Sequence, residues 1–409
     1  MKGKRVAVVG LGASGIAAAE LCRARGAAVT GVDQRPIDFR LGDFVLQKDA
    51  RFDAFDLVVV SPGVPSFPAL EAAKCPIWGE IELAFQCRMH VSPVVAVGGT
   101  NGKSTVTSLV AALLEAAGKK VFAGGNLGEP WASHADQRFD VVVLEVSSFQ
   151  MERVEKFRPD VAVLLNVTDD HLDRYASFDD YARAKGNCFV NQTERDLAVV
   201  PAGDAVCMRE AKRGRARVVT FDASIDYELR LRGAHNRLNA AAAIAAIEPF
   251  AVPRETIARV LATFEGLPHR MVHVAEIGGA HYYDDSKGTN VGATVTALLG
   301  LAEERAVLIA GGRDKQGSYA PLANAMKNKG RAAVVIGEAA ERIADALSPV
   351  VPVVRATSMD DAVKKSAELA KPGDAVLLSP ACSSFDMFRD YKHRGDEFVR
   401  AVRLLGAKK

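Results

Sequence analysis

The sequence predicts an α/β protein made of parallel sheets with helices on both faces. Short apolar runs, most of them rich in valine and nearly continuous, alternate with helical patterns along the chain. Buried parallel strands have this pattern because helices cover both faces of such a sheet. The expected strands are residues 6–9, 29–32, 57–60, 94–97, 141–146, 161–167, 197–200, 307–310, 333–336, 350–354 and 375–378.

The length and two breaks in the chain predict three domains. Domains usually contain about 100–200 residues, so a chain of 409 residues favours about three of them. Ser92-Pro93 precedes a new strand, and Gly266-Leu267-Pro268 follows the helical segment 255–264. We therefore expect domains at residues 1–91, 92–266 and 267–409.

Composition excludes several classes of protein. The chain is 49% hydrophobic and 25% charged, which is typical of a soluble globular protein. Its formal net charge is only +2, without the basic excess of nucleic-acid-binding proteins, and no apolar run reaches the roughly 18 residues of a membrane span. The six cysteines have no C-x-x-C spacing, which favours reduced thiols and a cytoplasmic location.

The first glycine-rich loop predicts a nucleotide diphosphate site in a Rossmann-like N-terminal domain. Residues 10–15 read G-x-G-x-x-G between an expected strand and helix, and Asp33 follows the next strand, 18 residues after Gly15. Glycines allow the backbone to approach a pyrophosphate, which the helix N-terminus also attracts. An NAD-dependent dehydrogenase would have this loop, and so would a βαβ turn that needs glycine only for packing. Ser61-Pro62-Gly63 ends another strand at the same edge.

The second glycine-rich loop predicts a central domain of the P-loop ATPase type. Residues 98–105 read GGTNGKST after a strand and before the expected helix 106–117, which Gly118 ends. In such a loop, backbone amides bind phosphates, Lys103 neutralises the β/γ charge, and the hydroxyl of Ser104 or Thr105 can ligate Mg²⁺. The standard spacing requires glycine at position 97, which is valine here, so this is a shortened variant.

Two acidic positions follow strands in this domain. Glu145 ends the apolar run 141–144, and at the carboxyl end of a parallel strand it would lie near the phosphate loop and hold Mg²⁺. It could also be a solvated acid at a strand end. Residues 166–174 contain an Asp cluster and His171. The cluster could cap a helix, and from His171 alone we favour an ordinary structural role.

Seven segments together resemble the Mur ligases of peptidoglycan synthesis. They are GTNGKST at 99–105, EVSSFQ at 145–150, NVTDDHLDRY at 166–175, GAHNRLN at 233–239, GLPHR at 266–270, DSKGTN at 285–290 and SPACSSFD at 379–386. They occur in the family's order and span nearly the whole chain. The resemblance implies a Rossmann-like C-terminal domain and points to the members that join D-glutamate to UDP-N-acetylmuramoyl-L-alanine.

The resemblance implies an ATP-dependent ligation through an acyl phosphate, in a cytoplasmic monomer that uses ATP and Mg²⁺. Its catalytic residues would be Lys103, Glu145, His171 and Lys185, with Lys185 carbamylated and, like His171, serving a second Mg²⁺. Without the carbamate, Lys185 looks like a surface helix residue. The implied ATP-binding residues are Gly99, Thr100, Asn101, Gly102, Lys103, Ser104, Thr105, Asn236, Asn239, Arg270 and Asp285.

The two other substrates have implied sites of their own. The UDP-sugar would contact Ala13, Ser14, Asp33, Arg35, Ser61, Gly63 and Asn126. D-Glutamate would contact Lys287, Thr289, Lys315, Ser383, Ser384 and Tyr391. Here the chain departs from the family: Gln316 follows Lys315 where glycine is usual, the downstream acid–aromatic pair is Ser318-Tyr319, and Tyr391 stands where phenylalanine is frequent.

Three alternatives remain at this point. The chain could be a Mur-type ligase for a different amino acid. It could be an NAD-dependent dehydrogenase, which would leave the second loop and Glu145 without a role. It could also be a nucleotide-sugar-binding protein without activity, which the presence of Lys103, Glu145, His171 and Lys185 disfavours.

Overall fold

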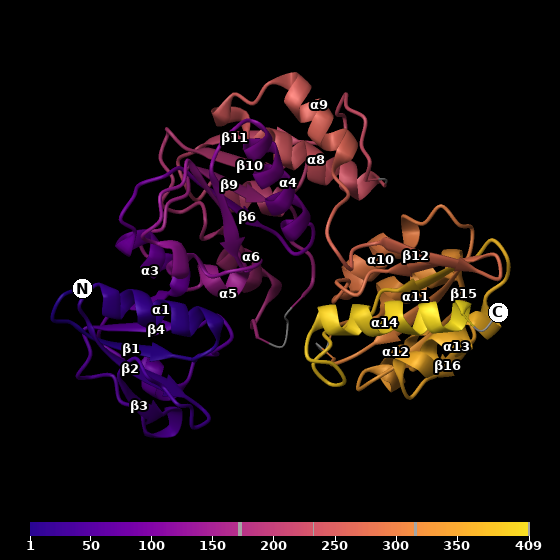
Figure 1. Ribbon diagram of the computed structural model, residues 1–409, viewed down its shortest axis with the longest axis horizontal. Coiled ribbons are helices and arrows are strands. Elements are labelled where there is room, and N and C mark those ends of the chain that lie inside the picture. Colours follow the sequence, from indigo (N-terminus) through magenta and orange to yellow (C-terminus); the bar gives the residue numbers. More distant parts are fainter. Residues whose placement is uncertain (171–173, 232, 315–316, 408–409) are drawn as a thin grey trace. The chain divides into compact units, whose positions relative to one another are not determined.

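A computed structural model describes residues 1–170, 174–231, 233–314 and 317–407 of the chain. These residues form three separate sheets with helices around them, so the predicted α/β class is confirmed (Figure 1). Each sheet lies within one of the three predicted domain ranges. The chain forms two compact units: one holds residues 1–167, 177–230 and 236–264, and the other holds 168–176, 231–235 and 265–409. The domain boundaries themselves stay predictions.

The first sheet has five parallel strands in the order β3-β2-β1-β4-β5. Its helices are short except for α1, which follows the first glycine loop. The strands are β1 (Arg5–Val9), β2 (Ala28–Asp33), β3 (Asp43–Leu46), β4 (Leu57–Val60) and β5 (Ile77–Gly79), and the helices are α1 (Ala13–Ala24), α2 (Pro68–Glu71) and α3 (Glu80–Cys87).

The central sheet has six parallel strands in the order β11-β10-β9-β6-β8-β7. Helices α4, α8 and α9 share one apolar core with its strands. The strands are β6 (Val94–Gly98), β7 (Val121–Gly125), β8 (Val141–Glu145), β9 (Val161–Leu164), β10 (Leu197–Pro201) and β11 (Arg217–Phe221). The helices are α4 (Lys103–Ala116), α5 (Ser148–Met151), α6 (Phe178–Gly186), α7 (Ala205–Ala211), α8 (Ala234–Ala246) and α9 (Arg254–Thr263).

The third sheet has six strands in the order β12-β13-β17-β14-β15-β16, and only the β12–β13 pair is antiparallel. The strands are β12 (Val272–Ile277), β13 (Ala280–Asp284), β14 (Ala306–Gly311), β15 (Gly330–Ile336), β16 (Val353–Arg355) and β17 (Ala375–Leu378). The helices are α10 (Val291–Leu299), α11 (Ala320–Lys329), α12 (Ala340–Leu347), α13 (Met359–Leu369) and α14 (Tyr391–Gly406).

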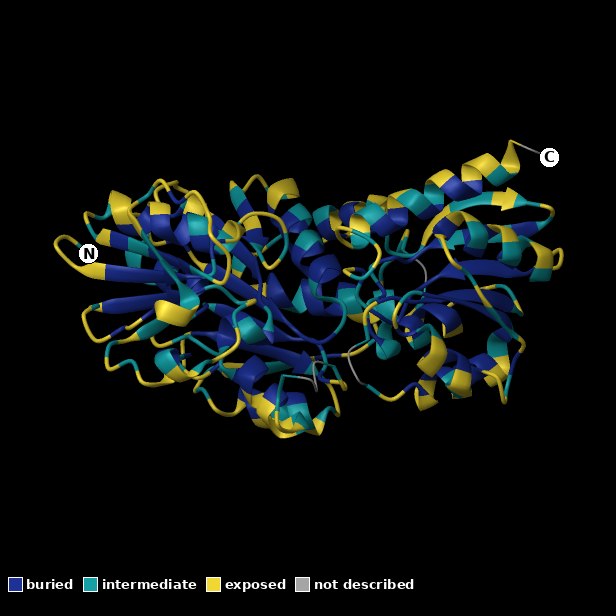
Figure 2. Cartoon of the chain, turned by 90° about the horizontal axis from the view of Figure 1, so that it is seen from below, coloured by how far each residue is buried: buried dark blue, intermediate teal, exposed yellow. Residues whose placement is uncertain are grey.

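Side-chain alternation divides the third sheet's core between its two faces. Ala306, Leu308 and Ala310 of β14 pack with α10, α11 and α12, whereas Val307 and Ile309 pack with α13 and α14. Successive side chains of a strand point to opposite faces, so a continuous apolar run indicates a sheet covered on both sides. Most strand residues are accordingly buried, and exposed residues gather on loops and outer helix faces (Figure 2).

The strands absent from the sequence prediction are mostly edge strands. β3, β5, β7, β11 and β12 each lie at the edge of their sheet, and β13 lies beside β12. Edge strands are partly exposed, so their sequences lack a continuous apolar run; β12, for example, has no fully buried residue. The run 350–354 yields only β16, and the run 161–167 ends as a strand at Leu164. Helix α4 starts at Lys103, three residues before the predicted start.

Buried glutamates on α3 fasten the first sheet's helices to the central part of the same unit. The carboxylate of Glu82, which is fully buried, accepts hydrogen bonds from the backbone N–H groups of Glu155, Lys156 and Phe157 at 2.8–2.9 Å. The carboxyl of Glu80 accepts one from the Ala132 N–H at 2.6 Å. Buried carboxylates are costly unless hydrogen-bonded, so Glu82, with three backbone donors, is better compensated than Glu80, whose Oε2 atom has no hydrogen-bond partner among the described residues. Burial raises the pKa of Glu80 to about 7.

Because of the Glu80 carboxyl, we expect the free energy of unfolding to fall as the pH rises. Its folded pKa of about 7 exceeds the ordinary value of 4.5. The contribution of the protonated Glu80 carboxyl to the free energy of unfolding is therefore fully present below about pH 4.5 and is lost as the pH rises through 7. We expect Glu80→Gln, which stays neutral and keeps an acceptor for Ala132, to unfold several degrees above the wild type at pH 8 and near it at pH 5.

Thermal unfolding followed between pH 5 and pH 8 measures this difference. Glu115→Gln is the matched control, because Glu115 is exposed on α4. A Glu80→Gln midpoint that shifts equally at both pH values would contradict the assignment.

Candidate active site

The second glycine-rich loop joins a fully buried strand, β6, to the N-terminus of α4. Gly99 and Gly102 have φ angles of 146° and 85°, which side chains rarely adopt. The Lys103 ammonium donates to the Thr100 carbonyl oxygen at 2.8 Å, so the side chain folds back over the loop. The arrangement of strand, loop, lysine and helix N-terminus is the one that binds phosphates.

Asn166 holds the outer side of this loop. Its carbonyl oxygen accepts a hydrogen bond from the Thr100 N–H at 3.0 Å, and its Oδ1 accepts one from the Asn101 N–H at 2.9 Å. Its Nδ2 donates to the Asn101 oxygen at 3.1 Å. The motif at 166–175 contains Asn166 but assigns it no role. Its position just after β9, beside β6 in the sheet, was the available signal.

Glu145 lies buried at the carboxyl end of β8, directly beside the loop's strand. It is 1% exposed and pairs in register with Val97 of β6 and with Gly125 of β7. The Asn126 side-chain amide donates to its Oε1 atom, and the Asn126 N–H donates to its carbonyl oxygen at 2.9 Å. A solvated strand-end acid is therefore the wrong interpretation of Glu145. Asn126, predicted for the sugar or peptide part, also orients this carboxylate.

Gly125 makes the contact between Asn126 and Glu145 possible. Its φ angle is 93°, and an added Cβ would lie 2.6 Å from the Glu145 carbonyl oxygen. Any side chain here would separate β7 from β8. Gly125 was not among the predicted site residues, although the pair Gly124-Gly125 directly before Asn126 is a signal in the sequence.

Lys185 is buried, which corrects the expectation of a surface lysine. Only 4% of the residue is exposed, and its ammonium donates to the Gly99 carbonyl oxygen at 2.8 Å. The ammonium also lies 4.5 Å from the ring centre of Tyr181, whose hydroxyl is 3.2 Å from the Thr100 Oγ1 atom. Helix α6 thus brings Lys185 and Tyr181 to the phosphate loop. Tyr181 is a further residue that the sequence analysis missed.

Helix α8 contributes Asn239 to the same place. A Cβ added to Gly102 would lie 2.5 Å from the Asn239 Oδ1 atom. Asn239 in turn donates to the Asn236 Oδ1 atom at 3.3 Å. The predicted nucleotide residues of this unit therefore gather around one loop: Gly99, Thr100, Asn101, Gly102, Lys103, Ser104, Thr105, Glu145, Lys185, Asn236 and Asn239.

The carboxyl edge of the first sheet brings together part of the predicted UDP-sugar set. The Asp33 carboxylate accepts hydrogen bonds from the Leu11 N–H at 2.8 Å and from the Arg35 N–H at 3.2 Å. The Ser61 hydroxyl donates to the Gly10 oxygen at 2.6 Å, so the two strand-end turns do face each other. Ala13 and Ser14 begin α1 beside them, and Gly63 is exposed two residues after Ser61.

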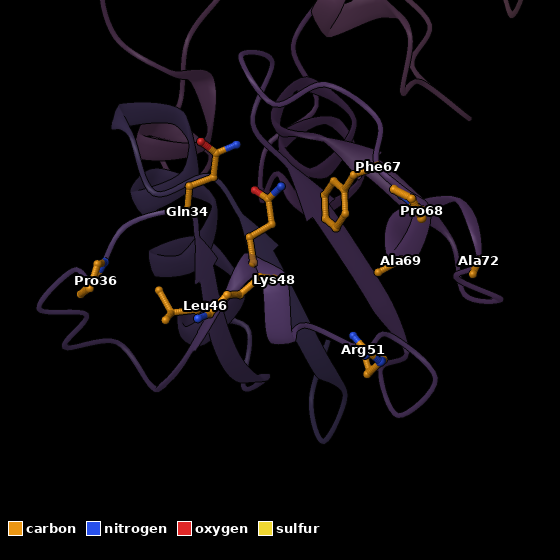
Figure 3. A pocket seen from close by; sticks show the side chains of 10 residues that line it. Gln34, Pro36, Leu46, Lys48, Arg51, Phe67, Pro68, Ala69 and Ala72 are labelled. Carbon is orange, nitrogen blue, oxygen red and sulfur yellow. The ribbon is translucent and has the colours of Figure 1, made fainter.

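An open pocket of ≈ 820 Å³ lies at the same edge (Figure 3). Gln34 borders it from the end of β2, Lys48 and Arg51 from the segment after β3, and Phe67 from the loop after β4. The lining combines two cations with an aromatic ring, which suits an anionic ligand with a flat apolar part. These residues were not predicted from the sequence, since exposed lysines and arginines carry no local signal.

The second unit holds the residues predicted for D-glutamate, together with Arg270 and Asp285. The Asp285 carboxylate accepts a hydrogen bond from the Ser379 hydroxyl at 2.7 Å. Burial raises the pKa of Asp285 to about 7, against the opposing effects of Ser379 and the Arg270 charge. Neighbouring Asp284 pairs with His269 Nδ1 at 2.6 Å.

Two loops and the start of α14 supply the candidate amino-acid-binding residues within the described part of the chain. The Lys287 ammonium lies 4.0 Å from the ring centre of Tyr391, and the Thr289 N–H donates to the Lys287 oxygen at 2.8 Å. Ser384 is buried, and the Ser383 oxygen accepts a hydrogen bond from the Arg313 N–H at 2.9 Å. His171 and Lys315, with Gln316, lie outside the described residues.

The donor set at the phosphate loop fits Mg²⁺. Among the described residues, no three His, Cys, Asp or Glu side chains come together as a metal site. Mg²⁺ does not need such a cluster, since it is usually held by one or two carboxylates, hydroxyls, waters and substrate phosphates. Glu145 and Ser104 are both buried and supply a carboxylate and a hydroxyl oxygen at adjacent elements.

Comparison with known proteins decides the family. The chain matches the Mur ligase middle domain over residues 97–226 and the Mur ligase glutamate ligase domain over residues 269–382. It is 42% identical to the UDP-N-acetylmuramoylalanine–D-glutamate ligase of Desulfosudis oleivorans, covering 98% of this chain and 96% of the relative. The ligase of that name from Geotalea daltonii is 41% identical over 99% of this chain and 98% of its own.

This chain belongs to the Mur ligase family.

Solved structures agree on the fold of this Mur ligase at low sequence identity. The MurF ligase of Thermotoga maritima, solved in complex with ADP, has a TM-score of 0.65 at 17% identity, covering 100% of this chain and 96% of that one. A pseudomurein peptide ligase type C from Methanothermus fervidus has a TM-score of 0.63 at 17% identity, covering 98% and 100%. Among the described helices, none combines the length and apolar character needed to cross a membrane.

Gly102 and Gly118 both have a positive φ, but only Gly102 lies in the phosphate loop of this Mur ligase. Comparing alanine variants of the two therefore distinguishes an effect on the loop from general backbone strain. We expect Gly102→Ala to reduce ATP-dependent activity by about 10²-fold or more, because its Cβ would displace Asn239 or the loop, and small misplacements of reacting groups have costs of that order. Gly118→Ala is the matched control. Its φ of 81° resembles the 85° of Gly102, but an added Cβ meets nothing within 4 Å.

Steady-state rates and thermal midpoints of both variants test this. Both should lose about 1 kcal/mol of stability from the left-handed conformation. Equal activities in the two variants would contradict the role of Gly102.

Proposed function

We propose that this chain joins D-glutamate to UDP-N-acetylmuramoyl-L-alanine, with ATP converted to ADP and phosphate. The observation that carries the proposal is the grouping of Lys103, Glu145 and Lys185 around one phosphate-binding loop. The full-length relatives named for this reaction support the choice of substrates. We expect a cytoplasmic enzyme that acts as a monomer and binds neither nucleic acid nor membrane.

The chemistry requires an activated carboxyl group. A carboxylate oxygen of the L-alanine part attacks the γ-phosphorus of ATP, the bond to the β,γ-bridging oxygen breaks, and ADP leaves. The D-glutamate amine then attacks the carbonyl carbon of this acyl phosphate. The tetrahedral intermediate loses inorganic phosphate, and the amine nitrogen loses a proton. Positioning and charge neutralisation are the protein's main tasks in such a transfer.

Lys103 and the loop amides would hold the β- and γ-phosphates. Solved structural neighbours were determined in complex with ADP or AMPPCP, a folylpolyglutamate synthase of Mycobacterium tuberculosis among them, which supports ATP here. The complete proposed nucleotide set is Gly99, Thr100, Asn101, Gly102, Lys103, Ser104, Thr105, Asn236, Asn239, Arg270 and Asp285.

Ser104 or Thr105 and Glu145 would hold one Mg²⁺, and His171 with a carbamylated Lys185 would serve a second. Bound Mg²⁺ neutralises phosphate charge during the transfer. An ammonium at Lys185 would repel a cation, whereas a carbamate ligates it. The burial of Lys185 beside Gly99 places its nitrogen at the phosphate loop, which supports this role.

The two remaining substrates would occupy the carboxyl edges of the other two sheets. The UDP-sugar would contact Ala13, Ser14, Asp33, Arg35, Ser61, Gly63 and Asn126, with the pocket beside Gln34 as an extension of this site. D-Glutamate would contact Lys287, Thr289, Lys315, Ser383, Ser384 and Tyr391. Carboxyl edges of parallel strands are where open α/β sheets bind ligands.

Loss of the loop lysine tests the reaction type. We expect Lys103→Ala to lose about 10³-fold in amide formation, because removal of one charge-stabilising donor costs about 10²–10³-fold. Lys119→Ala, on the exposed segment after the same helix, is the control and should stay near wild type. The assay follows phosphate release and product formation with UDP-N-acetylmuramoyl-L-alanine, ATP and single amino acids.

The amino-acid panel also tests the substrate choice. Product formed with L-alanine or diaminopimelate instead of D-glutamate would replace this proposal with another Mur-type activity. Unchanged amide formation by Lys103→Ala would overturn the ligase mechanism. Reduction of a nicotinamide cofactor without ATP would favour the dehydrogenase alternative.

The pocket at the first sheet predicts that loss of its two cations changes the KM for the UDP-sugar selectively. We expect the double variant Lys48→Ala, Arg51→Ala to raise the KM for the UDP-sugar about 5- to 10-fold, since exposed charges contribute about 1 kcal/mol or less each. The KM for D-glutamate and the kcat should change less than twofold. Lys74→Ala, an exposed lysine of the same domain outside the pocket, is the control. An unchanged KM for the UDP-sugar would separate the pocket from the substrate site.

A further inference from the structure

Arg394 is a buried arginine, the fourth residue of α14. The residue is 1% exposed, and its guanidinium is surrounded by oxygen acceptors. Its Nε donates to the Ser286 hydroxyl at 3.0 Å and its Nη2 to the Ser286 carbonyl oxygen at 2.9 Å. Its Nη1 donates to the Cys382 oxygen at 3.1 Å and, more weakly, toward the Gly311 oxygen at 3.5 Å.

These acceptors lie where three loops leave the carboxyl edge of the third sheet. Ser286 follows β13, Gly311 ends β14, and Cys382 follows β17. Two of these loops carry described residues of the proposed D-glutamate site: Lys287 and Thr289 on the first, Ser383 and Ser384 on the third. The Ser286 hydroxyl also donates to the Tyr391 backbone carbonyl oxygen at 2.8 Å. This hydrogen bond connects the start of α14 to the acceptors of Arg394.

The backbone around Arg394 is closely packed, with no room for a side chain at Gly312. Gly312 has a φ of 136°, and an added Cβ would lie 2.1 Å from the Ser383 oxygen and 3.1 Å from Arg394 Nη1. The Arg313 N–H donates to the Ser383 oxygen at 2.9 Å. The second and third loops therefore touch directly, and the guanidinium lies against their contact.

Arg394 has no carboxylate at ion-pair distance within the described part of the chain. Asp284, Asp285 and Asp386 act on it only through longer-range attraction, and burial lowers its pKa to about 10, so it stays charged at neutral pH. Burying a cation without a paired anion is costly. The planar guanidinium has five N–H donors and can bind several loops at once, which a lysine ammonium cannot do. This geometry is a reason for an arginine to be buried beneath these loops.

We propose that Arg394 is a positioning residue that holds the three loops in register for the acidic amino acid. This inference rests on the proposed function and deepens it. The guanidinium reaches the loops through main-chain oxygens and Ser286, so it acts through Lys287, Ser383 and Ser384 and does not itself touch the substrate. Its positive charge also favours a dianionic acceptor such as D-glutamate at this edge.

Steady-state kinetics of Arg394→Lys tests the proposal. A lysine keeps the charge but provides one point of donation for three loops. We expect the KM for D-glutamate to rise at least 10-fold, while the KM for ATP and for the UDP-sugar change less than twofold. Arg400→Lys is the matched control on the same helix, since Arg400 is half-exposed and pairs with Asp360 and Glu397. It should match the wild type.

If Arg394→Lys fails to fold, the variant Ser286→Ala tests the same proposal with the arginine retained. Ser286→Ala removes the acceptor of Nε and the link to Tyr391 while retaining the arginine, and it should raise the KM for D-glutamate about 3-fold. A KM for D-glutamate within the range of the Arg400→Lys control in the folded variants, or equal rises in all three KM values, would overturn the positioning role. Absence of D-glutamate ligation in the wild-type enzyme would instead overturn the proposed function.

Discussion

Close approach of the main chain to neighbouring segments at the carboxyl ends of parallel strands is the constraint on which the candidate site depends. At Gly102, Gly125 and Gly312, an added Cβ would lie 2.1–2.6 Å from an oxygen of a neighbouring segment. Each of these glycines has a positive φ. The absence of a side chain lets a loop turn sharply and still touch the next one. The phosphate loop, the Glu145–Asn126 contact and the loops above the third sheet all require this.

The buried charged side chains of the candidate sites share a second feature, which is the kind of group that they contact. Its formal net charge is +2, so polyanionic ligands must be attracted by local groups and not by a broad basic surface. Lys185 is buried against a backbone oxygen, Glu145 is buried against an amide, and Arg394 is buried among carbonyl oxygens. Neutral dipoles contact each of these three groups. A charge so held needs little reorganisation when a ligand of opposite sign arrives.

The first and central sheets are connected by a different set of buried polar contacts. Glu82 satisfies three consecutive backbone N–H groups of the segment after α5, and the Trp78 indole donates to Glu155 at 2.7 Å. The Arg25 guanidinium reaches both the Cys87 oxygen and Asp136. These contacts explain why two sheets that the sequence divides by a Ser-Pro break belong to one compact unit.

The sequence by itself determined the central strands, the two glycine loops and the family, because buried parallel strands and phosphate loops leave strong local patterns. It did not predict the edge strands β3, β5, β7, β11 and β12, since partial exposure removes the continuous apolar run. Tertiary structure alone decided that Lys185 is buried, that Asn166 and Tyr181 hold the phosphate loop, and that Arg394 joins three loops. Those outcomes depend on contacts between segments far apart in the chain, and a residue's own neighbours in sequence carry no record of such contacts.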